Sequence, residues 1–560
     1  MLAMYSNNHN DENEPPRQAF FPRRYRFLIR IIFPLIAVYL LYLIVYRPEN
    51  WIPNTSTEFP SPLPHGSDVN WLNRQQQVRK AFQHAWSAYE RDAWGCDEYH
   101  PISQRGSNLT TQGIGFTIVD SLDTLFLMNL TDEFRRARDW VANELDFDID
   151  GEVNLFETTI RVLGGLLSTY NLSGDMEFLS KAVDLADRLL GAFLSPTAIP
   201  YASVNLRRKS GIQAHFASGA SSTSEVTTLQ LEFKYLSYLT GDEKYWKKVE
   251  ETIFKIDSLE RVDGLVPIYI RHVSVSESLD NPNDGLFWGS RITLGARGDS
   301  YYEYLLKQYI QTSRTEPMYR RMYDQAMQGV KTRLVNYSLP SKLLFVGELL
   351  HPTSTSIIPK MDHLVCFLGG SLALGATEGR TIRSKEDYSA LSKNSREDLR
   401  IGTELTKSCA QMYFTTATGL APEIVYFNTD KTSMDDLNIK PMDSHSLLRP
   451  ETVESLFILW RITRNVKYRH WGWKIFEAFE KYAKHEKGGY TSLDDVTTIP
   501  PGRRDKMETF WLAETLKYLY LLFDDTDVLP LDKYVFNTEA HPLPIFMPSE
   551  EVRGAGWSRS

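Results

Sequence analysis

Residues 157–167 have the sequence Glu157-Thr158-Thr159-Ile160-Arg161-Val162-Leu163-Gly164-Gly165-Leu166-Leu167, an acid and two threonines before a largely apolar run. The same order opens further segments at Asp120, Asp123, Glu225, Asp299, Glu451, Glu508 and Glu514. An acid in the first turn of a helix interacts well with the helix dipole, so each position predicts a helix start and, alone, needs no other role. Their repetition predicts that parallel helices bring these carboxylates together, as acid/base chemistry on sugars or hard-cation binding requires.

Helical spacing dominates the chain from residue 71 onward. Apolar residues recur at three- and four-residue steps in 75–93 and 178–193, and sustained strand alternation is rare. The phrases Leu172-Ser173-Gly174-Asp175 and Leu239-Thr240-Gly241-Asp242 each indicate a helix end, a tight turn and the cap of the next helix. A repeat of roughly 67 residues gives about seven helix pairs. The predicted fold class is all-α, an (α/α)7 barrel of helix pairs, with an open solenoid of hairpins as the alternative.

Composition narrows the class of protein. The 560 residues are 42% hydrophobic and 12% aromatic, which is typical of a globular chain rich in the flat ring faces on which sugars stack. The net charge of −9 argues against nucleic acid as a partner. With three cysteines and no CxxC motif, the chain has no disulfide scaffold. In a luminal chain, a disulfide between Cys366 and Cys409 is the favoured interpretation, which leaves Cys96 as a buried small residue.

The N-terminal segment predicts a membrane anchor. Residues 27–46 are apolar except for Arg30, and about 20 apolar residues span a bilayer. Arginines precede this segment, so the positive-inside rule predicts a single-pass type II protein with residues 1–26 in the cytosol. Residues 47–70 are proline-rich and predict a stem, 71–545 form the luminal domain, and 546–560 form a C-terminal tail. A cleaved signal peptide is the alternative, and the short span favours an early-secretory membrane.

The run Asp146-Phe147-Asp148-Ile149-Asp150-Gly151, followed by Glu157, matches the calcium loop of an EF-hand. No second EF-hand is present to pair with it, and Glu157 also belongs to the acidic helix starts. The match to the loop pattern nevertheless leaves an alternative function, a membrane-anchored calcium buffer that uses residues 146–157.

Long motifs at these positions resemble the class I α1,2-mannosidases of glycoside hydrolase family 47. The matching stretches are Val153-Asn154-Leu155-Phe156-Glu157-Thr158-Thr159-Ile160-Arg161, Asp299-Ser300-Tyr301-Tyr302-Glu303-Tyr304, Met361-Asp362-His363-Leu364-Val365-Cys366, Arg449-Pro450-Glu451-Thr452-Val453-Glu454-Ser455 and Phe536-Asn537-Thr538-Glu539-Ala540-His541-Pro542. The similarity covers residues 75 to 545. It implies a seven-pair α/α barrel, a bound Ca²⁺ ion, and inverting hydrolysis of terminal α1,2-linked mannose.

The resemblance also implies roles for individual residues. Glu157 becomes the general acid, acting through a water, Glu451 the general base, and Asp299 the third essential carboxylate, while the group that activates the attacking water stays open between them. Inversion needs roughly 6.5 to 9.5 Å between the acid and base carboxyl groups, to leave room for that water. Thr538 is implied as the calcium ligand. The remaining implied substrate-binding and water-orienting residues are Glu225, Glu303, Glu454, Glu514, Glu539, Arg297, Arg449, His363 and the stacking platform Phe510.

Within the family, Arg297 matches the endoplasmic-reticulum members, where Golgi members have a smaller apolar residue. This implies removal of one mannose from the middle branch of a nine-mannose N-glycan, on glycoproteins, by an enzyme of the endoplasmic-reticulum membrane that serves glycoprotein processing and quality control. The alternatives are a Golgi-type α1,2-mannosidase and a non-catalytic mannosidase-like lectin of glycoprotein disposal.

Overall fold

The computed structural model describes residues 69–271, 284–289 and 291–549. The chain separates into the units Met1–Ser61 and Pro62–Ser560, and every described residue belongs to the second. No helix among these residues is both long and apolar enough to cross a bilayer. The predicted anchor, 27–46, and the tail, 1–26, lie outside the described residues.

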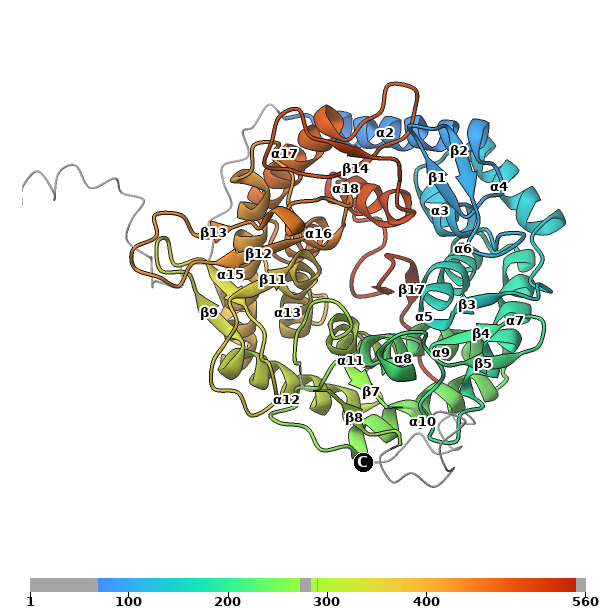
Figure 1. Ribbon diagram of the computed structural model, residues 1–560, viewed down its shortest axis with the longest axis horizontal. Helices are drawn as coiled ribbons and strands as arrows, with labels where there is room; N and C mark the ends of the chain where they lie inside the picture. The colour runs from blue at the N-terminus through green and yellow to red at the C-terminus, as the bar shows by residue number, and fades with distance from the viewer. Residues whose placement is uncertain (1–68, 272–283, 290, 550–560) are drawn as a thin grey trace, which may run out of the picture. The chain divides into compact units, whose positions relative to one another are not determined.

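Helices form two concentric layers (Figure 1). Within the described residues the inner layer consists of α3 (Phe116–Leu127), α6 (Gly164–Ser173), α9 (Gln230–Thr240), α11 (Asp299–Gln311), α13 (Phe367–Thr377), α16 (Glu451–Thr463) and α18 (Leu516–Leu522). The outer layer consists of α2 (Trp71–Asp92), α4 (Thr131–Asn143), α7 (Met176–Leu189), α10 (Lys244–Ser258), α12 (Pro317–Arg333), α15 (Lys393–Phe414) and α17 (Lys467–Tyr482).

The inner layer is a closed ring. Each inner helix contacts the next along the chain, and the ring closes where η6 (Trp511–Thr515), which leads into α18, contacts α3. Burial follows the layers: every residue of α13 is buried, whereas α4 buries only Ala137, Trp140 and Val141. The mostly helical architecture is confirmed, and the closed ring excludes the open solenoid.

The repeated turn phrase connects the layers as predicted. Gly174 follows α6 with φ = 73°, a left-handed conformation that costs glycine little, and Asp175 caps α7 by accepting from the Glu177 amide at 3.0 Å. Gly241 (φ = 72°) plays the same part after α9. These short turns join inner helix ends to outer helix starts.

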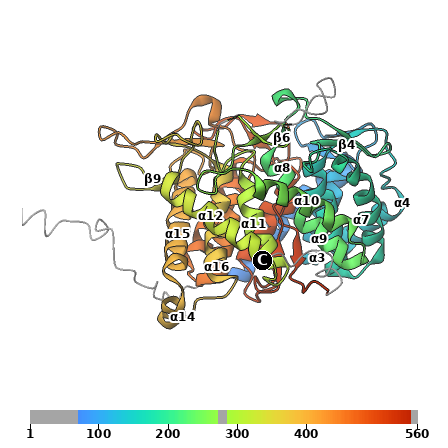
Figure 2. The same ribbon diagram turned by 90° about the horizontal axis from the view of Figure 1, so that it is seen from below.

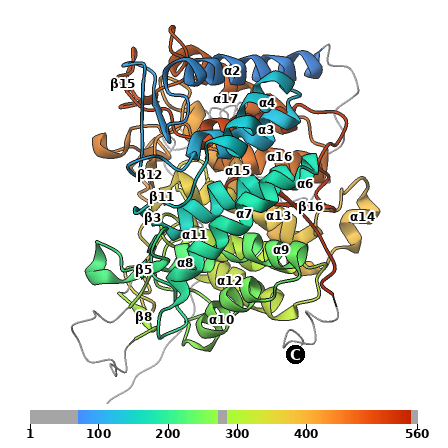
Figure 3. The same ribbon diagram turned by 90° about the vertical axis from the view of Figure 1, so that its right-hand side faces the viewer.

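Short strands, which the helical periodicity does not indicate, gather along the edge of the helical ring that lies opposite to these turns (Figures 2 and 3). They form small antiparallel sheets in the described part of the chain: β1 (Glu98–His100) with β2 (Arg105–Ser107); β3 (Glu152–Asn154), β4 (Ser203–Asn205) and β5 (Ser210–Ile212); β6 (Ser221–Ser222), β7 (Tyr269–Ile270) and β8 (Phe287–Trp288); β9 (Val335–Tyr337) with β10 (Leu344–Val346); β11 (Lys360–Asp362), β12 (Ile424–Phe427) and β13 (Leu437–Asn438); β14 (Ser492–Leu493) with β15 (Arg503–Arg504). Strands β3, β6 and β11 directly precede the short helical segments 155–157, 223–227 and 363–366, which lead into the inner helices α6, α9 and α13, so this edge carries inner helix N-termini.

Helices α13 and α15 pack closely. A Cβ atom on Gly369 would lie 2.1 Å from Thr406 Oγ1, and one on Gly402 would lie 2.6 Å from the Gly369 carbonyl oxygen. Glycine at both positions therefore permits the helices to approach. The predicted disulfide between Cys366 and Cys409 is confirmed and joins the start of α13 to α15. Cys96 is free and half-buried.

Candidate active site

Three of the predicted acids stand at inner helix starts on the strand-bearing edge. Glu157 is the last residue of the one-turn helix α5 (Leu155–Glu157) and precedes the π-helical segment η1 (Thr158–Leu163). Asp299 and Glu451 are the first residues of α11 and α16. Glu225 lies in the first turn of α8 (Thr223–Thr227). The predicted ring of acidic helix starts therefore exists at these positions.

Three other acids differ from the prediction. Asp120 and Asp123 do not begin a helix, because α3 starts at Phe116 after Gly115, and both are fully buried inside α3. Glu514 also lies within a helical segment, the π-helical η6, and is buried. π-helical turns occur frequently at functional sites; η1 directly follows Glu157, and η6 contains Glu514.

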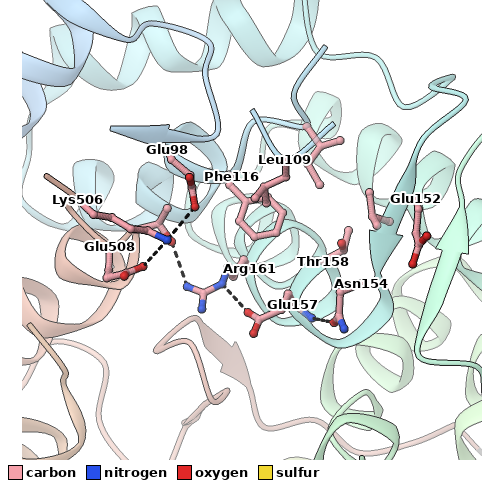
Figure 4. Close-up of a pocket in the computed structure, with 13 residues that line it drawn as sticks. Glu98, Leu109, Phe116, Glu152, Asn154, Glu157, Thr158, Arg161, Lys506 and Glu508 are labelled. Atoms are coloured by element: carbon pink, nitrogen blue, oxygen red, sulfur yellow. Dashed lines mark hydrogen bonds and ion pairs between the residues drawn. The ribbon is translucent and has the colours of Figure 1, made fainter. Parts of the chain in front are cut away.

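Arg161 connects Glu157 to the interior of the ring (Figure 4). Its Nε donates to Glu157 Oε2 at 2.9 Å, and its Nη1 donates to Thr509 Oγ1 at 3.0 Å and contacts Glu539. Burial alone would lower the pKa of Arg161, but the surrounding carboxylates outweigh it and raise the pKa above its usual value. Arg161 is therefore a fixed cation between Glu157 and the buried acids.

A cavity of about 360 Å³ opens beside Glu157 and Arg161. One wall holds the apolar side chains of Leu109 and Phe116. Lys506 lies on the other side, where its Nζ pairs with Glu98 Oε1 at 2.9 Å. A cavity with apolar walls and converging charges at the end of a helical ring has the character of a small-molecule site.

Glu451 is held in its charged form. Its Oε2 lies 2.7 Å from His363 Nδ1, and Arg449 Nη1 lies 4.0 Å from its Oε1. Burial would raise the pKa of Glu451, but the His363 hydrogen bond and the Arg449 charge lower it below the usual value. His363 is itself positioned by Tyr413, whose hydroxyl lies 2.9 Å from Nε2.

Asp299 has the opposite environment. Burial, reinforced by the charges of Glu303 and Glu451, raises its pKa to about 7, although its Oδ1 accepts from the Ser300 amide at 2.7 Å. Asp299 and Glu451 are thus close enough to interact, and their pKa values are displaced in opposite directions. Such a pair is the usual arrangement of an acid and a base at one site.

A buried lysine lies deeper in the ring. Lys307 Nζ contacts Glu303, four residues earlier in α11, and lies 3.4 Å from Glu454 Oε1. Burial raises the pKa of Glu454 to about 8 even beside this cation. Burial and the charges of their acidic neighbours also raise the pKa values of Glu514 and Glu539 well above the usual range. The predicted carboxylates therefore crowd into one buried region with few cations.

The hairpin of β16 (Tyr534–Phe536) and β17 (Pro542–Pro544) lies inside the ring (Figure 1), and its turn holds Thr538 and Glu539. Glu539 contacts Arg161 of the acidic cluster. Strand β16 contacts α11 and β17 contacts α6. At the turn, the Thr538 amide donates a long hydrogen bond of 3.4 Å to Tyr304 Oη. Among the described residues, no hydrogen bond involves its hydroxyl or carbonyl oxygen, so both are free to bind a ligand.

His541 anchors this hairpin to α3. Its Nδ1 lies 2.8 Å from Asp123 Oδ2 and its Nε2 lies 3.1 Å from Asp120 Oδ1. Burial would lower the pKa of His541, but the two aspartates raise it. Lys517 adds a bond from Nζ to the Ala540 carbonyl oxygen at 2.8 Å. Asp120 and Asp123 therefore position the turn that carries Thr538.

The remaining predicted residues surround the same region. Phe510 is 8% exposed and lies between two guanidinium groups, with Arg161 Cζ 5.8 Å and Arg449 Cζ 5.7 Å from its ring centre. Arg297 Nη1 lies 3.6 Å from Glu225 Oε1. Burial raises the pKa of Glu225 despite this neighbour.

The EF-hand-like run does not form a calcium loop. Residues 146–150 alternate between exposed aspartates and buried apolar side chains, as an extended segment does. Asp148 Oδ1 pairs with Arg188 at 3.1 Å and Asp150 Oδ2 pairs with Arg208 at 2.9 Å, so these carboxylates point to different partners. Across the described residues, no three His, Cys, Asp or Glu side chains are grouped to hold a metal directly.

Sequence reasoning missed three charged residues of the site: Arg161, Lys307 and His541. Arg161 and Lys307 each follow a predicted acid by four residues, a spacing at which charged side chains meet on one helix face. That pattern was available in the sequence. His541 lies inside the quoted hairpin motif, but its aspartate partners come from a distant helix, and no local spacing reveals them.

Asp299 and Glu451, whose pKa values are shifted in opposite directions, stand at the starts of α11 and α16 in a closed ring of helices. Carboxyl groups in two such environments suit the acid/base chemistry of a glycosidase built on a helical barrel. Residues 81–545 match the model of Glycosyl hydrolase family 47. The chain belongs to this family and is a glycoside hydrolase.

Named relatives agree with this assignment. The chain is 50% identical over 498 residues to a mannosyl-oligosaccharide 1,2-alpha-mannosidase of Candida albicans, covering 87% of this chain and 86% of that protein. It is 46% identical over 518 residues to the human endoplasmic reticulum mannosyl-oligosaccharide 1,2-alpha-mannosidase, covering 90% and 70%. The solved structure of an alpha-1,2-mannosidase from Trichoderma reesei superposes with a TM-score of 0.75 at 27% identity, over 85% of this chain and 99% of that one.

Proposed function

We propose that this protein is an inverting α1,2-mannosidase that removes terminal mannose from high-mannose N-glycans on glycoproteins. The relatives above supply the substrate class through their names. The observation that supports the chemistry is the pair Asp299 and Glu451, one holding a proton near neutral pH and the other ionised. A glycosidase needs both forms at once.

Glu451 is the base in this proposal. Its carboxylate accepts a proton from the attacking water, while His363 and Arg449 hold it ionised and oriented. In an inverting enzyme the water attacks from the face opposite the leaving group, which predicts the roughly 6.5 to 9.5 Å separation of acid and base.

The proton for the leaving oxygen comes from Asp299. The family resemblance implies Glu157 as the acid through a water, whereas burial raises the pKa of Asp299 to about 7, so that a large fraction of Asp299 is protonated near neutral pH. The proposal therefore places the proton on Asp299 and assigns Glu157, fixed by Arg161, to bind the water through which the proton passes.

Calcium fits the centre of the site. The free oxygens of Thr538 and the crowded carboxylates are hard oxygen donors, which suit Ca²⁺. The residues that would hold the ion, directly or through waters, are Thr538, Glu225, Glu303, Glu454, Glu514 and Glu539. When bound, the ion would hold the sugar hydroxyls and favour a distorted ring. The crowding of buried acids, with raised pKa values, is the feature that a bound cation would relieve.

The finer assignment is removal of one middle-branch mannose, from a nine-mannose to an eight-mannose glycan, in the endoplasmic reticulum. The match of Arg297 to the endoplasmic-reticulum members of the family supports the branch assignment. The names of the human and Saccharomyces cerevisiae relatives, which include the endoplasmic reticulum, support the compartment. A Golgi-type enzyme would remove several mannoses. Digestion of the nine-mannose glycan, with NMR mapping of the branch that is trimmed, tests this: loss of mannose from the outer branches first would reject it.

The pH dependence of kcat/KM follows from the two shifted groups. Below about pH 7 Asp299 holds its proton, and Glu451, with its lowered pKa, remains ionised well into the acid range. We expect kcat/KM to fall as the pH rises through about 7, because Asp299 then loses the proton it donates. Asp299→Asn should abolish this basic limb along with most activity. A rate that increases through pH 7 in the wild type would contradict the role of Asp299 as donor.

A further inference from the structure

Three aromatic side chains lie together at the strand-bearing edge, next to the acids but not among the predicted site residues. Tyr269 of β7 is paired in register with Trp288 of β8, and their ring centres are 6.0 Å apart. Phe216, from the loop before β6, places its ring 6.5 Å from that of Tyr269. Strand β7 pairs with β6, which directly precedes α8, and the first turn of α8 holds Glu225. Figure 1 shows β7 close to α8 in the ring.

Arg297 connects these rings to the site. Its guanidinium carbon lies 4.1 Å from the centre of the Phe216 ring and 5.5 Å from that of Tyr269. The same guanidinium lies 3.6 Å from Glu225. The backbone fixes this arrangement, because Arg297 adopts φ = 74° and its carbonyl oxygen accepts from the Ser224 amide at 3.0 Å. A left-handed non-glycine residue beside a site is a strained conformation that the surroundings hold in place.

The rings are not buried by the fold. Phe216 is 40% exposed and Trp288 is 37% exposed. Exposed aromatic surface that is grouped, rather than scattered, commonly marks a binding site. The neighbouring guanidinium and carboxylate supply hydrogen-bonding groups beside an apolar face, and a sugar ring presents the matching surface: an apolar face of C–H groups edged by hydroxyls.

We propose that Phe216, Tyr269 and Trp288 form an aromatic platform that binds a mannosyl residue of the N-glycan other than the one being released. This inference rests on the proposed function and extends it to the substrate's uncut part. The C–H face of that mannose packs on the exposed rings, and Arg297 holds the Phe216 ring while its remaining donors face the sugar hydroxyls. A substrate too short to reach the platform does not use it.

The test compares two substrates in the full-length protein. Phe216→Leu and Trp288→Ala should each lower kcat/KM for the nine-mannose glycan about tenfold, through a higher KM, because one aromatic contact of this kind is worth about that factor. The kcat/KM for α1,2-linked mannobiose should change by less than about twofold by the same reasoning, since its two sugars occupy the catalytic end. Phe216→Tyr, which keeps the ring, should behave as the wild type on both substrates.

The matched control is Phe254→Ala, which removes an aromatic residue of similar exposure (39%) from the outer helix α10. Phe254→Ala should leave kcat/KM for both substrates at the wild-type value. Equal losses on both substrates in the platform variants, or full glycan activity in Phe216→Leu, would overturn the platform. Failure of the proposed function is distinguishable, because the wild-type protein itself would then release no mannose from either substrate.

Discussion

Replacing Glu451 with glutamine should lower kcat for mannose release by about 10³-fold, within the range that general base catalysis contributes. Glutamine keeps the shape of the side chain and can still meet His363 and Arg449, but it cannot take a proton from the attacking water. The Glu451 side chain is nearly buried and lies 2.7 Å from His363 Nδ1. Because a glutamine oxygen can accept the same hydrogen bond, the variant should retain the fold and bind the glycan. Assays of free mannose measure the loss of catalysis, and calorimetry measures glycan binding, so the two experiments separate a catalytic defect from a binding defect.

Glu404→Gln on the outer helix α15 provides the control, since Glu404 also pairs with an arginine, Arg400, at 2.8 Å but lies on the surface. It should retain wild-type kcat. Equal turnover by the wild type and Glu451→Gln would contradict the assignment of the base. If neither protein releases mannose above background while both bind the glycan, the lectin function would be favoured instead.

Replacing Thr538 with valine should remove the response to calcium. Valine matches threonine in shape but lacks the hydroxyl, which has no hydrogen-bond partner among the described residues. At a calcium concentration of about 100 times Kd, binding should stabilise the wild-type protein by about 2.7 kcal/mol. The variant should lose most of this increment and about 10²-fold or more in kcat. Thermal unfolding with calcium and with a chelator measures the first effect without reference to activity.

The calcium control is the surface run that resembles an EF-hand loop. Asp148→Asn removes a carboxylate that pairs with Arg188 and Arg207, and it should leave the calcium-dependent stabilisation unchanged. Loss of that stabilisation in Asp148→Asn, together with its retention in Thr538→Val, would place the calcium site at residues 146–157 and would contradict a site at Thr538.

The helix pairs were predictable because their signals are local. Gly174 and Asp175 mark one turn between layers, and the apolar period marks the helices on either side. Ring closure was not predictable in this way, since it depends on the contact of α3 with η6, which lie at opposite ends of the described fold in sequence. The strands were missed because most have only two or three residues, too few for alternation to be recognised.

The acidic side chains of the site were predictable, but their chemical forms were not. The capping pattern and the family motifs both indicated Asp299 and Glu451. Their opposed pKa shifts arise from tertiary neighbours: burial dominates at Asp299, and His363 and Arg449 dominate over burial at Glu451. The capping pattern also misplaced Asp120 and Asp123, which Gly115 and the early start of α3 put inside a helix, where they hold His541 instead.

The configuration of the released sugar tests the central claim most directly. Proton NMR during the first minutes of glycan digestion, before mutarotation, distinguishes the anomers of free mannose. A base and an acid on opposite faces of the sugar predict β-mannose as the first product. First-formed α-mannose would mean a covalent intermediate on one of these carboxylates, and would contradict the roles assigned to Glu451 and Asp299.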